Sequence, residues 1–115
     1  MKRVYICHPY SADPVEHTQR IQAICRRVVA MGHNPIAPQL WLPQFIDEET
    51  DRDNAMTLCL DIVGICSEMW IFHPGQEKPG ILSSGQEMEV EEATLLIPTR
   101  HVYERPDGGW EFIYG

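Results

Sequence analysis

Short runs of β-forming residues alternate with longer helical patterns along this chain, and this alternation limits its possible folds more than any other feature. The runs at residues 3–8, 35–37 and 68–73 are each followed directly by a proline, which ends a strand. Residues 14–31 and 51–67, which lie between them, carry apolar side chains at helical spacing. Strands separated by helices form parallel β-α-β units, so we predict an α/β fold with a mostly parallel sheet.

The ends of the predicted elements support this interpretation. Asp13 followed by Pro14 is typical of a helix start, and Gly32 is a typical residue beyond a helix end. A third helix is expected from the region of Ser83 to about Leu96, and the turn at residues 106–109 predicts a closing hairpin. We therefore expect a flavodoxin-like or Rossmann-like three-layer sandwich, with a five-stranded sheet and helices on both faces.

Length and composition limit the class of protein. A chain of 115 residues is long enough for one modest core, so we expect a single domain over residues 1–115. The net charge of -8 argues against nucleic acid as a partner. We see neither an apolar run long enough for a membrane span nor a secretory signal, and four scattered cysteines suit buried thiols. We expect a cytoplasmic protein without a disulfide or a metal site.

One glutamate of the stretch SSGQEMEVEEA, residues 83–93, stands out from its neighbours. With about 100° of rotation per residue, Glu89 falls at the edge of the apolar stripe, whereas Glu87 and Glu91 point toward water. Peptide dipoles near the helix start help to keep a partly buried carboxylate ionised. Glu89 is therefore a candidate nucleophile, although glutamates at such boundaries are also common without a function.

A second carboxylate, Asp61, lies on a polar strip of the predicted second helix. Gly64 follows three residues later on the same side and suggests a close approach of another group. Cleavage of a glycosidic bond needs one carboxylate at the anomeric carbon and another group that protonates the departing atom, and Asp61 with Glu89 would meet that need. Without other evidence, a solvated aspartate is the simpler interpretation.

Three segments of the chain resemble the nucleoside 2-deoxyribosyltransferases and the related deoxynucleoside 5'-monophosphate N-glycosidases. VYICHPY resembles the family's first strand and loop, LDIVGICSEMWIF its segment before the third strand, and SSGQEMEVEEA its nucleophile motif. The similarity extends from Val4 to about Ala93. It implies that Glu89 is the nucleophile, that Asp61 is the catalytic aspartate and that the hydroxyl of Tyr5 orients the nucleophile.

The same resemblance implies hydrolysis or transfer at the N-glycosidic bond of a nucleoside or nucleoside 5'-monophosphate, through a covalent glycosyl-glutamate and without a cofactor. Ser83, Ser84 and Gly85 open the helix, where free N–H groups suit a 5'-phosphate. By the same resemblance, Ser83 stands where the monophosphate hydrolases carry serine and the transferases often carry aspartate, which favours a nucleotide substrate and water as acceptor. The loop HPYSAD, however, lacks the glycine and arginine that hold phosphate in the hydrolases. The resemblance also implies a homodimer or higher homo-oligomer.

Further candidates follow from the rule that ligands bind outside the carboxyl ends of parallel strands. His8 and His73 end their strands and are expected to contact substrate, while Tyr10 and Trp41 lie in loops where a base could stack. Two alternatives remain open at this point. One is a module of the same fold that binds a nucleotide or metabolite without turnover, and the other is a glycosidase for a nucleotide-derived signal or cofactor.

Overall fold

A five-stranded sheet organises the molecule in the computed structural model, which describes residues 1–9, 13–47, 49–75 and 82–114. The sheet has the strand order β2-β1-β3-β4-β5, and β5 alone runs antiparallel to its neighbour. The strands are β1 (Arg3–Cys7), β2 (Asn34–Ile36), β3 (Glu68–Phe72), β4 (Thr99–Glu104) and β5 (Trp110–Tyr114). The predicted parallel sheet and its closing hairpin are confirmed.

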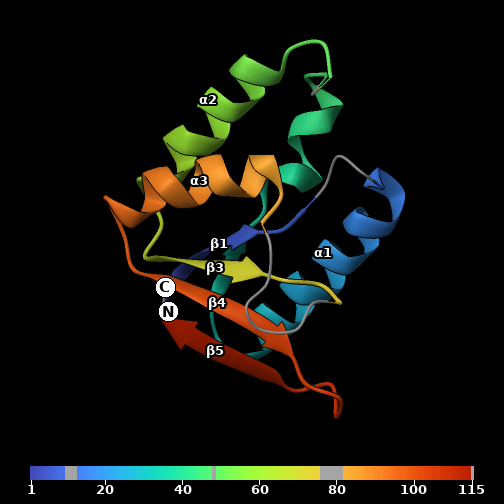
Figure 1. The fold of residues 1–115 in the computed structure, drawn as a ribbon, viewed down its shortest axis with the longest axis vertical. Helices are drawn as coiled ribbons and strands as arrows, with labels where there is room; N and C mark the ends of the chain where they lie inside the picture. Colours follow the sequence, from blue (N-terminus) through green and yellow to red (C-terminus); the bar gives the residue numbers. More distant parts are fainter. Residues whose placement is uncertain (10–12, 48, 76–81, 115) are drawn as a thin grey trace.

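Helices cover both faces of this sheet, as the three-layer prediction requires (Figure 1). Helix α1 (Pro14–Ala30) lies on one face, and α2 (Arg52–Val63) and α3 (Ser84–Thr94) lie side by side on the other. Two short 3-10 helices, η1 (Pro38–Leu40) and η2 (Leu42–Gln44), connect β2 to α2.

Each face of the sheet has its own hydrophobic core, because successive strand residues point to opposite sides. On the α1 side, Ile21 and Val28 of the helix pack against even-numbered strand residues such as Ile6 and Trp70. On the other side, Val63 and Ala93 pack against odd-numbered residues: Tyr5, Cys7, Met69 and Ile71. The odd-numbered side of β1 therefore faces α2 and α3.

The helix starts and ends agree in part with the sequence. The Asp13 side chain caps α1 by accepting from the Glu16 N–H, and Gly32 has the left-handed φ of 87° expected beyond its end. Helix α2 ends at Val63, four residues before the expected end. The expected close approach at Gly64 was wrong: it is the C-cap of α2 in a right-handed conformation, and an added Cβ would lie 3.8 Å from the Asp61 carbonyl oxygen.

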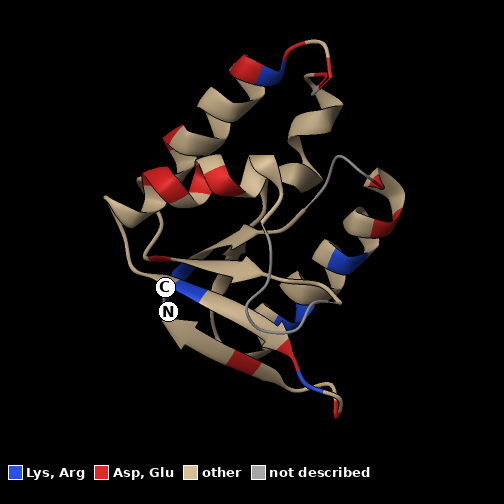
Figure 2. Ribbon diagram, viewed as in Figure 1, with Lys and Arg blue, Asp and Glu red and all other residues tan. Residues whose placement is uncertain are grey.

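Charge is unevenly distributed over the elements, with acidic residues on α2 and α3 and basic residues near the starts of β1 and β4 (Figure 2). Near these basic residues, Glu68 at the start of β3 is buried and accepts hydrogen bonds from Lys2 Nζ at 3.0 Å and from Trp70 Nε1 at 2.6 Å. These contacts join the N-terminus to β3. None of the helices in the described ranges is long and apolar enough to cross a bilayer.

Candidate active site

A cavity of about 780 Å³ opens at the carboxyl ends of β1 and β2, under the N-termini of α2 and α3. Its wall is formed by His8 after β1, by Gln39 and part of the segment between η1 and α2, by one side of α2, and by the start of α3. It matches the expected crevice in part: His8, the segment after Ala37 and the first turns of α3 contribute to it, whereas the described residues of the loop after His73 do not.

Glu89 is the buried carboxylate of this cavity. Its side chain lines the wall and the residue is 7% exposed, whereas Glu87, Glu91 and Glu92 of the same helix are exposed. The rotation predicted from the sequence is therefore confirmed for Glu89, and its position near the N-terminus of α3 brings it within the field of the helix dipole.

Gln86 fixes the start of α3 to the sheet, a role that sequence reasoning missed. Its Nε2 donates to the carbonyl oxygens of Phe72 at 2.9 Å and Cys7 at 3.4 Å, and its Oε1 accepts from the Ser83 N–H at 3.0 Å. The Ser83 hydroxyl in turn accepts from the Gln86 N–H, which completes a capping box. The Ser-x-x-Gln spacing could have revealed the capping box but not the contacts to β1 and β3. Glu89 is thereby held one turn from an anchored residue.

Tyr5 lies behind the cavity wall, fully buried among Cys7, Cys59 and Glu89. Burial raises the pKa of the Tyr5 phenol well above its ordinary value, and the negative charge of Glu89 and the two thiols raise it further. Burial also raises the pKa of Cys7, and the charge of Glu89 and a hydrogen bond to that carboxylate add to the effect. The two groups next to Glu89 on β1 therefore keep their protons and can act as hydrogen-bond donors.

Asp61 does not join this group, so the expected trio of Tyr5, Asp61 and Glu89 is not brought together. Asp61 is exposed on α2 and does not line the cavity. The side of α2 that faces inward carries Ala55, Cys59 and Val63, spaced four residues apart, and Asp61 lies two residues beyond Cys59 on another side. The α2 residue that reaches Tyr5 and the cavity is therefore Cys59, which the sequence analysis did not select.

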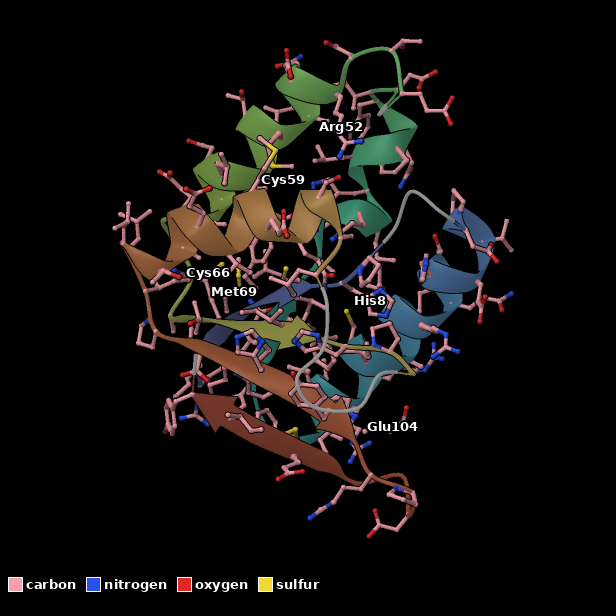
Figure 3. All side chains as sticks on the ribbon, in the orientation of Figure 1. His8, Arg52, Cys59, Cys66, Met69 and Glu104 are labelled. Atoms are coloured by element: carbon pink, nitrogen blue, oxygen red, sulfur yellow. The ribbon has the colours of Figure 1, made fainter. Side chains whose placement is uncertain are left out.

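His8 directly follows β1, between the sheet and α1 (Figure 3). It is 3% exposed, its Nδ1 lies 2.7 Å from the Pro9 carbonyl oxygen, and its ring packs edge-on against His17 with centroids 5.2 Å apart. Burial lowers the His8 pKa to about 4; the Pro9 carbonyl opposes this shift, and His17 and Arg20 reinforce it. The imidazole is therefore neutral at pH 7.

Two polar side chains of the wall were not predicted. Arg52 opens α2 at the rim of the cavity and donates from Nη2 to the Ser84 hydroxyl at 3.0 Å, which joins the N-termini of α2 and α3. Gln39 is 5% exposed and donates from Nε2 to the His8 carbonyl oxygen at 3.3 Å. Within the described residues, its buried Oε1 has no hydrogen-bond partner. The cavity thus has a cation at its rim and, in its wall, a side-chain amide whose oxygen is unpaired among the described residues.

The remaining predicted contacts are divided. Ser83 and Gly85 line the cavity, while Ser84 touches it only through Arg52. His73 and Trp41 do not line it. His73 borders a smaller cavity of about 230 Å³, and its Nε2 lies 2.7 Å from Nδ1 of His101.

The expected role of Tyr10 concerns a residue outside the described ranges. Over those ranges, no cluster of three His, Cys, Asp or Glu side chains is arranged to hold a metal ion.

Comparison with known proteins assigns the chain to a family. A family model described as "Domain of unknown function (DUF7768)" matches residues 2–101. The chain belongs to this family. No curated protein matches the sequence of this DUF7768 member.

Solved structures share the fold of the DUF7768 chain. A 2-desoxiribosyltransferase from Leishmania mexicana superposes with a TM-score of 0.62 at 16% identity, covering 92% of this chain and 68% of the other. A 2-deoxyribosyltransferase from the psychrotolerant bacterium Bacillus psychrosaccharolyticus gives a TM-score of 0.61 at 13% identity, covering 86% and 70%. At such identities the likeness establishes a common fold.

Proposed function

We propose that this protein cleaves the N-glycosidic bond of a nucleoside or nucleoside 5'-monophosphate through a covalent intermediate on Glu89. The observation that carries the proposal is the burial of this carboxylate in the wall of the main cavity, at the edge of the sheet where α/β proteins bind ligands. The fold shared with two 2-deoxyribosyltransferases adds support.

In the first step a carboxylate oxygen of Glu89 attacks C1' of the sugar. The C1'–N bond breaks, its electron pair stays on the departing nitrogen, and the base takes up a proton from water in the cavity. In the second step water, or a second base, attacks C1', and the ester electron pair returns to Glu89. Two displacements at one carbon retain its configuration.

The groups around Glu89 suit this chemistry. The Cys7 thiol donates a hydrogen bond to the Glu89 carboxylate, and the protonated Tyr5 phenol is buried beside it. Neither group neutralises the charge of Glu89, which leaves it nucleophilic. Gln39 lines the cavity, and its buried Oε1 has no hydrogen-bond partner among the described residues, so a small rotation of this amide would let it accept an N–H group of the departing base.

Phosphate recognition is proposed for the rim of the cavity. The free N–H groups at the start of α3 and the guanidinium of Arg52 lie together there, joined by the bond to Ser84. These groups favour a 5'-monophosphate over a free nucleoside. Asp61 has no part in the proposed reaction because it is exposed on another side of α2.

A homo-oligomer is proposed as the active form. Three apolar side chains near the ends of α2 and α3, those of Ile65, Leu95 and Leu96, are between 55% and 80% exposed. Exposed apolar groups of this size are suited to a subunit contact.

The second candidate is a binding module that holds a nucleotide without turnover. The exclusion of Asp61 from the cavity favours it, because a binder needs no acid beside Glu89. The two candidates differ in one measurable property, the release of free base.

The test is incubation with a panel of deoxynucleosides, ribonucleosides and their 5'-monophosphates, with free base followed by chromatography. We expect base release by the wild type, at least a hundredfold less by Glu89→Gln, and unchanged release by Glu87→Gln, the matched exposed glutamate of α3 (roughly 3 kcal/mol of lost transition-state stabilisation). A ligand-induced rise in melting temperature without any base release would instead support the binding module.

A further inference from the structure

We infer that His8 is the base that accepts a proton from the attacking water when the glycosyl-Glu89 ester is hydrolysed. This inference rests on the proposed function and adds the group that activates its acceptor. With Asp61 outside the cavity, the residue expected to perform acid-base chemistry cannot reach C1', and another group of the wall must do so.

The backbone determines which nitrogen of His8 carries the proton. Nδ1 lies 2.7 Å from the Pro9 carbonyl oxygen, and a carbonyl oxygen can only accept a hydrogen bond. Nδ1 is therefore the protonated nitrogen of the neutral ring, and Nε2 carries the lone pair. A base in the second step needs this tautomer.

Packing fixes the ring in that orientation. His17 of α1 stands edge-on to it at 5.2 Å between centroids, and Phe72 of β3 lies tilted against it at 6.4 Å. The main chain is held as well, because the Gln39 amide donates to the His8 carbonyl oxygen at 3.3 Å. His8 and Glu89 both line the main cavity, and His8 also borders the smaller one. A molecule that fills the main cavity can therefore contact both side chains.

The charges around His8 keep its ring neutral, so that Nε2 retains its lone pair. His17 and Arg20 face it from α1, Phe72 faces it from β3, and burial with these two basic neighbours lowers its pKa to about 4. At neutral pH the ring is thus uncharged. It is a base of about the strength of a carboxylate, but without the charge that would repel Glu89.

The other ionisable side chains of the described wall are less suited to this step. Asp47 is exposed, and its Oδ1 accepts the N–H groups of Glu49 and Thr50. Glu49 is also exposed, Arg52 is a cation, and Cys59 is packed beside Tyr5. Among these groups, His8 is the buried side chain with a basic nitrogen.

The step balances in atoms and charge. The water oxygen forms a bond to C1' while one water proton moves to Nε2 of His8. The C1'–O bond to Glu89 breaks, and its electron pair restores the carboxylate. The resulting imidazolium, unfavourable in its buried site, then releases the proton to solvent.

The test uses His8→Asn, in which the amide can still donate to the Pro9 carbonyl but no base remains at the position of Nε2. We expect this variant to release one equivalent of base in a rapid burst and then to turn over about 10²–10⁴ times more slowly than the wild type. The pentosyl ester should accumulate and appear in the intact mass. The control is His33→Asn, which replaces a histidine directly before β2, at the end of the strands away from the cavity. This variant should behave like the wild type.

Two further readouts separate a base from a structural residue. Azide needs no deprotonation, so it should restore turnover of His8→Asn by forming the glycosyl azide. The rate at which the wild type hydrolyses its glycosyl ester, measured in a single turnover after the burst, should fall as pH decreases toward about 4. Because Glu89 is esterified in this step, the fall reports His8. His8→Gln provides a second variant if the first does not fold.

The outcomes distinguish this inference from the proposed function. If a folded His8 variant hydrolyses its substrate at the wild-type rate, the role of His8 is overturned and the proposed function still stands. The same conclusion follows if the variant loses both the burst and the turnover and azide does not restore them. A wild type that releases no base from any substrate overturns both proposals.

Discussion

Replacement of Gln86 tests how the start of α3 is held against the sheet. In the folded protein, this 3% exposed side chain makes three hydrogen bonds with main-chain groups, at 2.9, 3.0 and 3.4 Å. Gln86→Ala removes all three and leaves the Phe72 carbonyl oxygen and the Ser83 N–H without these partners. The loss is most costly at the carbonyl oxygens of Phe72 and Cys7, which belong to buried residues that water cannot easily reach.

The expected loss of stability follows from the number and length of these bonds. A typical hydrogen bond contributes about 1 kcal/mol net, and a buried group left without a partner costs about 1–3 kcal/mol. The bond at 3.4 Å is long and counts for less, so we expect Gln86→Ala to lower the free energy of unfolding by about 2–4 kcal/mol. Gln86→Glu should be at least as harmful, because a carboxylate cannot donate to the two carbonyl oxygens.

Urea denaturation followed by circular dichroism measures this difference. The matched control is Gln44→Ala, which removes one bond of 3.3 Å to the Leu40 carbonyl oxygen from an exposed side chain and should change the free energy by less than about 0.5 kcal/mol. If Gln86→Ala unfolds at the same urea concentration as this control, the anchoring of α3 by Gln86 is refuted.

Three further predictions concern Asp61, Gly64 and Glu68. Asp61→Asn should keep its base release within about twofold of the wild type, and a loss comparable with that of Glu89→Gln in the same assay would contradict the exposed position of Asp61. Gly64→Ala should raise the free energy of unfolding by about 0.4–1 kcal/mol in urea denaturation, because φ is -63° and the added Cβ is accommodated; destabilisation would count against this. Burial raises the pKa of Glu68, but hydrogen bonds from Trp70 and Lys2 and nearby cations outweigh it, and the net pKa is lowered. The stability that Glu68 contributes is therefore present above its ordinary pKa of 4.5 and is lost as pH falls through the lower pKa of the folded state. Between pH 6 and pH 3, the melting temperature of Glu68→Gln should thus fall less than that of the wild type. Equal falls for the two proteins would argue against this role of Glu68.

Local patterns in the sequence carried most of the fold. A proline lies two residues after the end of each of the first three strands, and Asp13 caps α1 as its position predicts. The inward position of Glu89 followed from helical rotation because its neighbours on α3 are clearly divided between apolar and acidic residues. These features depend on residues close in sequence, where spacing decides geometry.

The rest of the site depends on contacts that spacing cannot show. Helix α2 has apolar residues on several sides, so rotation alone could not decide whether Cys59 or Asp61 faces the sheet. Gln86 binds main-chain groups 14 and 79 residues away, and such partners are set by the tertiary fold. The tautomer of His8 likewise depends on the direction of one carbonyl group.

The central claim, a covalent sugar on Glu89, is tested most directly by mass spectrometry. The protein is mixed with the substrate that gives the fastest base release, quenched in acid within the first turnover, digested and mapped. We predict one added pentosyl group, with its phosphate for a nucleotide, on the peptide that contains Glu89, and none in Glu89→Gln. Rapid base release with no adduct at Glu89, or an adduct that persists in Glu89→Gln, would contradict the claim.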